Sequence, residues 1–231
     1  MAGGLTFVLL QFDYRWDWSG VTARAGVFFQ GWLLTLAISV VSLLLALLLG
    51  VTVALAHRSR VELVRALAKV YVELIRGSPL LVQILFVWYV LFYGASGEWR
   101  LPVGVLVLSL FSSAYLSEII RSGLQSVGDS QWDSARAIGL TTAQTYRHVV
   151  VPQALKNILS PLVGQFANLI KDSSLLSIIS IGEFTFQAQQ IDANTFSPFE
   201  AYFPLAIGYL ALTLPLSFCS RWLEARAQYA T

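Results

Sequence analysis

Residues 31–56 carry no charged side chain, and almost all of them are apolar. A helix needs roughly 20 apolar residues to cross the ~30 Å hydrocarbon core of a bilayer. This stretch is therefore long enough to span a membrane. The chain as a whole is 56% hydrophobic and only 12% charged, with a mean hydropathy of +0.67. These values predict a polytopic membrane protein and not a soluble fold.

Two further counts limit the classes of function. The formal net charge is only +2, which is too small to predict binding to nucleic acid. The single cysteine, Cys219, excludes an internal disulfide framework and a cysteine-based metal cluster. We therefore expect no metal site and no nucleic-acid partner.

We predict an all-α fold with five membrane-spanning helices in a single domain, residues 1–231. The predicted spans are 31–56, 80–93, 101–122, 158–181 and 202–222. Residues 61–76 have helical spacing but also carry charged side chains, so this segment is expected to begin at the membrane interface. Two polar segments, about 123–157 and 182–201, are expected to lie outside the membrane.

Basic residues predict the orientation of these spans. They gather after the first span, around 121–156, and in the tail after the last span. Cytosolic loops carry an excess of Lys and Arg, so these three regions are expected in the cytosol. Five spans then place the N-terminus outside and the C-terminus in the cytosol. Segment 182–201 becomes an extracytoplasmic loop.

The polar segment 129–152 is expected to form two short helices joined by a turn. Ser130 can cap the first helix together with Asp133, three residues later, whose carboxylate also suits the positive end of a helix. Gly139 is expected to end this helix, because glycine accepts the left-handed conformation common after a helix C-terminus.

A second capping box, Thr141 with Gln144, predicts the second helix of this segment. Pro152 is expected to end it, because proline lacks the backbone N–H that a helix interior needs. Two capped helices between two spans suggest a rigid protrusion that a partner grips. The simpler alternative is a long cytosolic loop that folded into helices without any partner.

Lys171 and Asp172 lie within the predicted fourth span, where charged side chains cost about 2.5–3.5 kcal/mol each on insertion scales. Asn168 and Asp172 share one helix face, and Gln83 and Ser113 of other spans are expected near the same depth. Together these polar groups predict a site for a zwitterion such as an amino acid. The alternative is that Lys171 pairs with a carboxylate on a neighbouring helix and only holds the bundle together.

Four further charged residues are expected near the cytosolic ends of the second and third spans. They are Glu73, Arg76, Glu118 and Arg121. We predict that they form an inner ring of salt bridges that opens and closes as a gate. Residues 77–79 (Gly-Ser-Pro) supply a helix break on which such a gate could pivot. The alternative for this break is an ordinary helix entrance with proline early in the helix.

The order of residues in the polar segment resembles the EAA coupling loop of ABC-importer permeases. Asp133, Ser134 and Ala135 are followed four residues later by Gly139 and then by an apolar run. Asp133 stands where that family usually has Glu, and Ser134 where it usually has Ala. The resemblance implies that this loop docks on an ATPase. The residues implied at the contact are Asp133, Ser134, Ala135, Gly139, Leu140 and Arg147.

Three other stretches resemble the permeases of polar amino-acid ABC importers of the histidine/glutamine type. They are YVELIRGSPLLVQ (71–83), AYLSEIIRSG (114–123) and LIKDSSLLSIIS (169–180). Ser122 stands where that family commonly has Gly, and Ser173 where it has Thr. The resemblance implies a type I importer architecture, with a translocation path for polar amino acids and a location in the bacterial inner membrane.

The implied partners are a cytosolic ABC ATPase dimer, a second permease subunit of the same or a homologous chain, and an extracytoplasmic amino-acid-binding protein. The chain contains no GxxxxGK[ST] phosphate loop, so ATP and Mg²⁺ are expected on the partner and no cofactor in this chain. An embedded enzyme is disfavoured because no HExxH motif occurs. We therefore expect no catalytic residues. A passive channel for small polar solutes remains the alternative function.

Overall fold

The computed structural model describes residues 16–228, and within that range every regular element is helical. The long helices are α3 (Ala25–Ala56), α6 (Arg100–Gln125), α9 (Val151–Asp172) and α11 (Pro198–Gln228). The shorter α-helices are α2 (Ser19–Ala23), α4 (Glu62–Gly77), α5 (Leu80–Phe86), α7 (Asp129–Ala137), α8 (Thr142–Thr145) and α10 (Phe184–Thr195). Two π-helical turns, η1 (Val87–Leu91) and η3 (Tyr146–Val150), and two 3-10 helices, η2 (Gly97–Trp99) and η4 (Ser173–Ile179), complete the elements. The predicted all-α fold class is confirmed.

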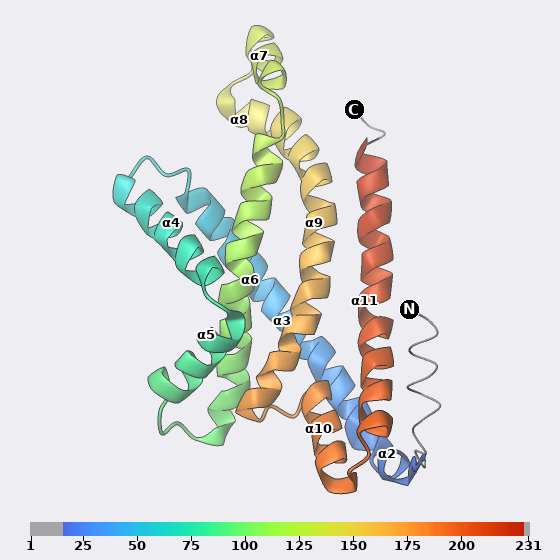
Figure 1. Cartoon of the computed structure of the whole chain (residues 1–231). Helices are drawn as coiled ribbons and strands as arrows, with labels where there is room; N and C mark the ends of the chain where they lie inside the picture. Colours follow the sequence, from blue (N-terminus) through green and yellow to red (C-terminus); the bar gives the residue numbers. More distant parts are fainter. Residues whose placement is uncertain (1–15, 229–231) are drawn as a thin grey trace, which may run out of the picture.

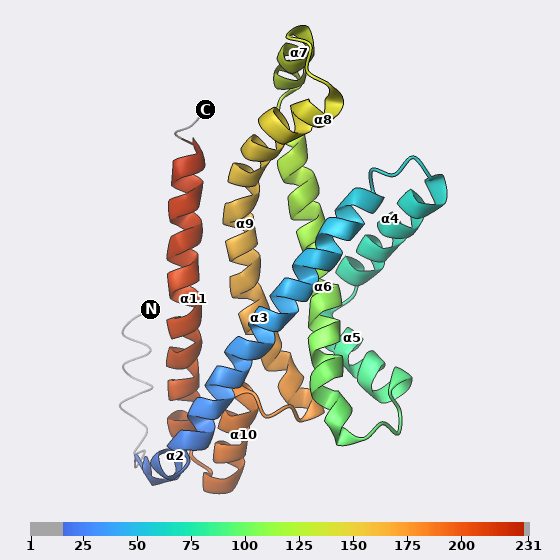
Figure 2. The same cartoon turned by 180° about the vertical axis from the view of Figure 1, so that it is seen from behind.

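Helix α6 occupies the centre of the bundle and packs against α3, α4 and α9. Helix α3 crosses α6 obliquely, and α11 runs beside α9 (Figures 1 and 2). The main buried cluster includes Ile38 of α3, Ile84 of α5, Leu108 of α6 and Leu169 of α9. This cluster therefore joins segments between residues 38 and 181, and α10 packs in a separate buried cluster.

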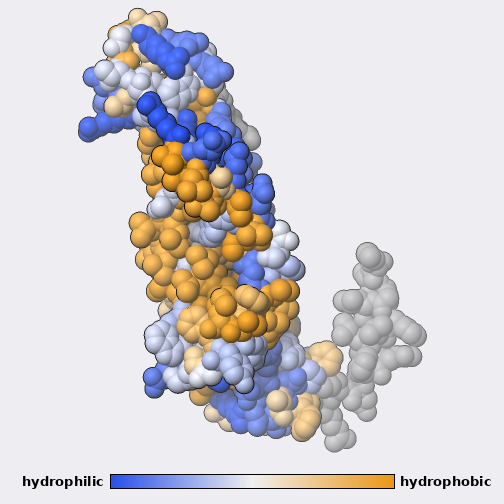
Figure 3. Space-filling model, turned by 90° about the vertical axis from the view of Figure 1, so that its left-hand side faces the viewer, coloured by the Kyte–Doolittle hydropathy of each residue, from blue (hydrophilic) through white to orange (hydrophobic). Residues whose placement is uncertain are grey.

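The outer surface of the bundle is apolar over its middle and polar toward both ends, as Figure 3 shows for one side. Large apolar side chains are exposed along α3 and α11, and the most apolar window of α11 contains no buried residue. Apolar surface of this extent is expected where a protein faces the hydrocarbon core of a bilayer. The belt thus agrees with the membrane class predicted from composition.

The predicted count of five spans is not confirmed. Among the described residues, three helical segments are long and apolar enough to cross a membrane: α3, α6 with η2, and α11. The pair formed by α4 and α5–η1 qualifies as a fourth if it is counted as one span bent by 103°. Helix α9 does not qualify, because polar residues are spread along it. The prediction of one domain covers residues 1–15 and 229–231, which lie outside the described residues.

The break predicted at residues 77–79 is confirmed between α4 and α5. Ser78 and Pro79 adopt extended backbone conformations there. The side-chain amide of Gln83 donates hydrogen bonds to the carbonyl oxygens of Ile75 (2.7 Å) and Ser78 (3.2 Å). Gln83 therefore satisfies backbone acceptors that the end of α4 leaves without helical partners.

Candidate functional site

Helices α7 and α8 form a protrusion at one end of the bundle, between α6 and α9 (Figures 1 and 2). The capping box predicted for the second helix is present. The Gln144 amide N–H donates to Thr141 Oγ1 (3.3 Å), and the Thr141 N–H donates to Gln144 Oε1 (2.9 Å). Gly139 has φ +82°, so the left-handed conformation predicted after the first helix is also confirmed.

The predicted start of the first helix in this protrusion is wrong by two residues, because Ser130 was expected to be its N-cap. Helix α7 begins at Asp129, its N-cap is Gly128 in an extended conformation, and no side chain caps it. Ser130 therefore lies inside the helix. Asp133 does not complete a capping box but lies 3.7 Å from Arg136 in an exposed ion pair. Asp129 instead places a carboxylate in the first turn, at the positive end of the helix dipole.

The predicted end of the second helix at Pro152 is also wrong. Helix α8 passes through the π-helical turn η3 directly into α9, and Pro152 lies in the first turn of α9. Proline removes one backbone hydrogen bond and crowds the turn before it. A π-helical turn widens the helix locally at that position. The protrusion is thus continuous with α9 and not separated from it.

Aromatic packing holds the two arms of the protrusion together. The rings of Trp132 and Tyr146 meet edge to face with centroids 4.9 Å apart. The guanidinium carbon of Arg58, in the segment between α3 and α4, lies 5.6 Å from the centre of the Tyr146 ring. Ala135 is buried (3% exposed). The protrusion therefore contacts the end of α3 as well as α6 and α9.

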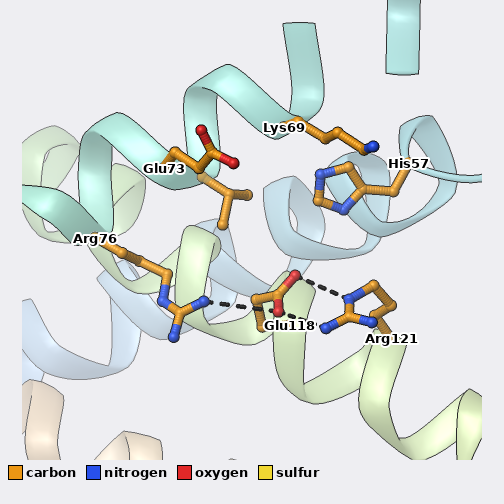
Figure 4. Close-up of a pocket in the computed structure, with 7 residues that line it drawn as sticks. His57, Lys69, Glu73, Arg76, Glu118 and Arg121 are labelled. Atoms are coloured by element: carbon orange, nitrogen blue, oxygen red, sulfur yellow. Dashed lines mark hydrogen bonds and ion pairs between the residues drawn. The ribbon is translucent and has the colours of Figure 1, made fainter. Parts of the chain in front are cut away.

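The structure brings the four predicted gate residues to one cavity of about 380 Å³. We call it the inner cavity, and its lining residues are His57, Lys69, Val72, Glu73, Arg76, Glu118 and Arg121. Figure 4 shows Arg76 and Arg121 converging on Glu118. The residues that line the cavity belong to α4, to the C-terminal half of α6 and to the residue that follows α3. Figure 1 shows α4 in the half of the bundle that carries the protrusion.

Glu118 is the centre of the charged network in the inner cavity. Its carboxylate lies 2.7 Å from the nearest Arg121 nitrogen and 3.6 Å from Arg76 Nη1. Arg121 Nη1 also donates to Gln125 Oε1 (2.7 Å). Glu73 forms no ion pair with a residue in the described range. The network links α4 to α6, because Arg76 and Glu118 belong to different helices.

Lys171 and Asp172 lie at the C-terminal end of α9, where α9 gives way to η4. The predicted span 158–181 is therefore not one continuous α-helix, and the two residues lie at a helix end and not at its middle. Asn168 and Lys171 are exposed and Asp172 is half-buried. Within residues 16–228, Lys171 has no carboxylate within 4 Å. The chain by itself thus does not supply the ion pair of the packing alternative.

Ser113 and Gln83 use their polar groups within the chain. Ser113 is fully buried, and its hydroxyl lies 2.6 Å from the Tyr71 hydroxyl. Tyr71 also donates to the Leu110 carbonyl (2.8 Å). Gln83 bonds across the α4–α5 break, as described above. In this conformation both residues support the helices around the inner cavity.

Sequence reasoning placed Glu183 in a polar loop and assigned it no role. The structure buries it completely as the N-cap of α10, accepting from the N–H groups of Thr185 (2.9 Å) and Phe186 (2.8 Å). It also accepts from Thr35 Oγ1 (3.3 Å) on α3 and from the Tyr209 hydroxyl (3.1 Å) on α11. Glu183 lies outside the membrane-spanning helices. Burial raises the pKa of its carboxyl group to about 7. The sequence signal for this role was the apolar i, i+4, i+7 pattern after Glu183, which indicates a helix that begins directly behind it.

Residues 46–229 match the protein family described as "Binding-protein-dependent transport system inner membrane component". The chain belongs to this family. The family description agrees with the predicted inner-membrane location. The permease is 37% identical over 205 residues to the probable glutamine ABC transporter permease protein GlnM of Bacillus subtilis, covering 87% of this chain and 94% of that protein. It is 34% identical over 215 residues to the glutamine transport system permease protein GlnP of Escherichia coli, covering 92% and 98%.

Chains of two solved transporter structures also resemble this permease. The permease resembles a chain of "Crystal structure of an amino acid ABC transporter with histidines" with a TM-score of 0.84 and 34% identity, covering 92% of this chain and 100% of that one. It shares its fold with a chain of the MetNI methionine ABC transporter at a TM-score of 0.72 and 18% identity, covering 88% and 97%. The resemblance to amino-acid ABC-importer permeases and the type I architecture that it implied are confirmed.

Proposed function

We propose that this permease is the membrane subunit of an ATP-driven importer for polar amino acids. The observation that carries the proposal is the helical protrusion, placed between α6 and α9 in a chain that belongs to this transport family. A passive channel would need no such structure. The names of the similar permeases, which refer to glutamine and arginine, support polar amino acids as the substrate class.

The protrusion is the proposed docking surface for a cytosolic ATPase dimer. Asp133, Ser134, Ala135, Gly139, Leu140 and Arg147 are the proposed contacts. Both Asp133 and Arg136 are largely exposed, so their charges are accessible to a partner. ATP-driven closure of the ATPases moves the protrusion, and α9 follows it because η3 runs directly into α9. On the other side, residues 126–128 connect the protrusion to α6. ATP and Mg²⁺ are bound by the partner.

The proposed translocation path is lined by Lys171, Asp172 and Asn168. The two charges present both signs to the two ends of an amino acid, and the exposure of Lys171 and Asn168 supports access to them. Gln83 and Ser113 are included as proposed path residues, which requires that their internal hydrogen bonds be exchanged for substrate contacts. The gate formed by Glu73, Arg76, Glu118 and Arg121 closes this path toward the protrusion.

The full assembly contains a second permease subunit, of the same or a homologous chain, and an extracytoplasmic amino-acid-binding protein. We place the N-terminus outside and the C-terminus in the cytosol. Both chain ends lie outside the described residues, and the basic residues around the protrusion support this orientation.

The test is a reconstituted complex. The permease is co-purified with its ATPase, reconstituted in proteoliposomes with the binding protein, and supplied with a panel of labelled amino acids. We expect uptake of one or more polar amino acids only with ATP and the binding protein. Uptake by the permease alone, without any ATPase, would establish the passive-channel alternative.

A further inference from the structure

The inner cavity contains one half whose charges are paired and one half whose charges are not. Arg76 and Arg121 both pair with the single carboxylate of Glu118 in the paired half, which leaves a net positive charge there. In the other half, Lys69 and Glu73 lie one turn apart on α4, and neither forms a hydrogen bond or ion pair with any residue of the described chain. Figure 4 shows Lys69 reaching toward His57 and away from Glu118. Both residues are exposed, so an ammonium group and a carboxylate border the same space and are accessible to a ligand.

His57 adds unused hydrogen-bonding capacity beside this space. It follows the last residue of α3, and both of its ring nitrogens are buried without a hydrogen-bond partner in residues 16–228. Buried polar groups in native structures nearly always have a partner, and an exception calls for an explanation such as a ligand. The unpaired imidazole lies on the cavity wall that Lys69 faces.

We propose that the inner cavity binds a zwitterionic amino acid, with its carboxylate against Lys69 and its ammonium group against Glu73. His57 joins the carboxylate site when its ring turns a buried nitrogen toward the cavity. A simple anion would meet the unpaired carboxylate of Glu73, and a simple cation would meet Lys69 and the two arginines. A molecule with both charges satisfies both groups. The volume of about 380 Å³ lies at the small end of the roughly 300–1,000 Å³ found for small-molecule sites.

This site is separate from the proposed path residues Lys171 and Asp172. Those residues lie at the end of α9 far from the protrusion, whereas the inner cavity lies toward the protrusion (Figure 1). The inference rests on the proposed function for the identity of its ligand. It adds a second contact for the amino acid, at the gate itself, because the gate residues line this cavity. The ligand would touch α4 through Lys69 and Glu73, the helix that Arg76 ties to Glu118.

Binding to the full-length permease in nanodiscs tests the site. The probes are tritiated L-glutamine and L-arginine, with the N-acetyl derivative and the methyl ester of each as competitors. We expect the parent amino acids to compete and both derivatives to fail, because each lacks one charge. Lys69→Met and Glu73→Gln should each weaken binding at least about tenfold. Lys69→Arg, which keeps the charge, should retain it.

Matched controls keep the charge change but move it away from the cavity. Lys156→Met on α9 and Glu62→Gln at the start of α4 alter exposed residues that do not line the cavity, and both should leave binding unchanged. Lys171→Met distinguishes the two proposed sites. Binding that survives Lys171→Met but not Lys69→Met supports the inner cavity. The reverse pattern overturns this inference while leaving the proposed function intact.

Two further outcomes would overturn the inference. If wild-type permease binds neither probe while the complex transports it, the cavity is not an amino-acid site. If binding occurs in phosphatidylcholine nanodiscs but is displaced in phosphatidylglycerol nanodiscs, an anionic lipid headgroup is the preferred occupant. Transport by the complex, measured separately, reports on the proposed function alone.

Discussion

Glu183 joins three helices through one carboxyl group. It caps the N-terminus of α10 and accepts hydrogen bonds from Thr35 of α3 and Tyr209 of α11. The backbone N–H of Phe184 in turn donates to Thr35 Oγ1 (3.1 Å). These bonds fix the turn between η4 and α10, at the end of the bundle opposite the protrusion (Figure 1). A buried carboxyl with this many partners makes the junction sensitive to its protonation state.

The stability of the junction should therefore depend on pH. The pKa of Glu183 is about 7 in the folded protein against a reference value of 4.5, so the folded state holds the proton more tightly. Its contribution is fully present below about pH 4.5 and is lost as pH rises through about 7. The total loss is about 3 kcal/mol. We expect the apparent melting temperature of detergent-solubilised permease to fall over this interval.

The matching variant is Glu183→Gln, which keeps the shape and cannot ionise. Its amide oxygen can accept from the Phe186 N–H while its amide nitrogen donates toward Thr35, so that only the Thr185 N–H loses its acceptor on α10. Subtracting the variant's melting curve from that of the wild type isolates the titration of this group. Equal pH dependence of the two proteins between pH 4.5 and 7 would contradict the prediction.

Gly139 lies in the turn of the protrusion that is the proposed docking surface for the ATPase. Its φ of +82° lies in the left-handed region, where a β-branched side chain is strongly disfavoured. Gly139→Val should abolish stimulation of the partner ATPase and transport while the permease still inserts in the membrane. The measurement is ATP hydrolysis by the reconstituted complex.

Gly26→Val on α3 is the control for this substitution. At both positions no heavy atom lies within 4 Å of an added Cβ, but only Gly139 has a positive φ. The two variants therefore differ in backbone strain and not in crowding. Normal ATPase stimulation in Gly139→Val would refute docking at this turn.

At the scale of elements, the bend between α4 and α5 is held by a side chain from beyond the break. The two segments meet at 103°, and Pro79 cannot donate a backbone hydrogen bond there. Gln83 compensates by reaching back to the carbonyls of Ile75 and Ser78. The bend positions Arg76 of α4 opposite Glu118 of α6.

Gln83→Ala should lower stability by about 1–3 kcal/mol, because it leaves these backbone acceptors without a donor. The apparent melting temperature of the solubilised protein measures this loss. Gln190→Ala replaces an exposed glutamine of α10 whose side chain makes no hydrogen bond with the described residues; it is the control and should have little effect. If Gln83→Ala instead changes substrate preference and leaves the melting temperature unchanged, Gln83 acts on the substrate and not on the bend.

At the scale of the whole molecule, α9 connects the two ends of the permease. It runs from the protrusion to Lys171 and Asp172, about 33 Å at 1.5 Å per residue for its 22 residues. The π-helical turn η3 leads into it without a loop. A displacement of the protrusion can therefore reach the proposed path residues through one helix, in which Pro161 removes one backbone hydrogen bond.

Neutralising either charge at the far end of α9 tests that assignment. Lys171→Met and Asp172→Asn should each reduce transport of the preferred amino acid roughly tenfold or shift preference among acidic, neutral and basic amino acids. Lys156→Met, an exposed lysine on the same helix, should not. The readout is uptake of a labelled panel by the reconstituted complex. An unchanged substrate profile in both variants would assign the pair to packing.

Features that depend on neighbouring residues could be predicted from the sequence. The apolar stretches predicted a helical membrane protein, and the Thr141–Gln144 box and Gly139 predicted the caps of the protrusion. The helix break at Pro79 could also be predicted, because it depends only on neighbouring residues. These predictions hold because helix length, capping and proline chemistry act within a few residues of chain.

Features that depend on contacts between distant segments came only from the tertiary structure. Pro152 did not end its helix, because a π-helical turn absorbed the missing hydrogen bond. His57 and Lys69 joined the predicted gate residues only when the end of α3 met α4 and α6. Glu183 became a buried junction because α3, α10 and α11 converge on it. Burial and partner choice are set by packing in three dimensions, which the order of residues alone does not specify.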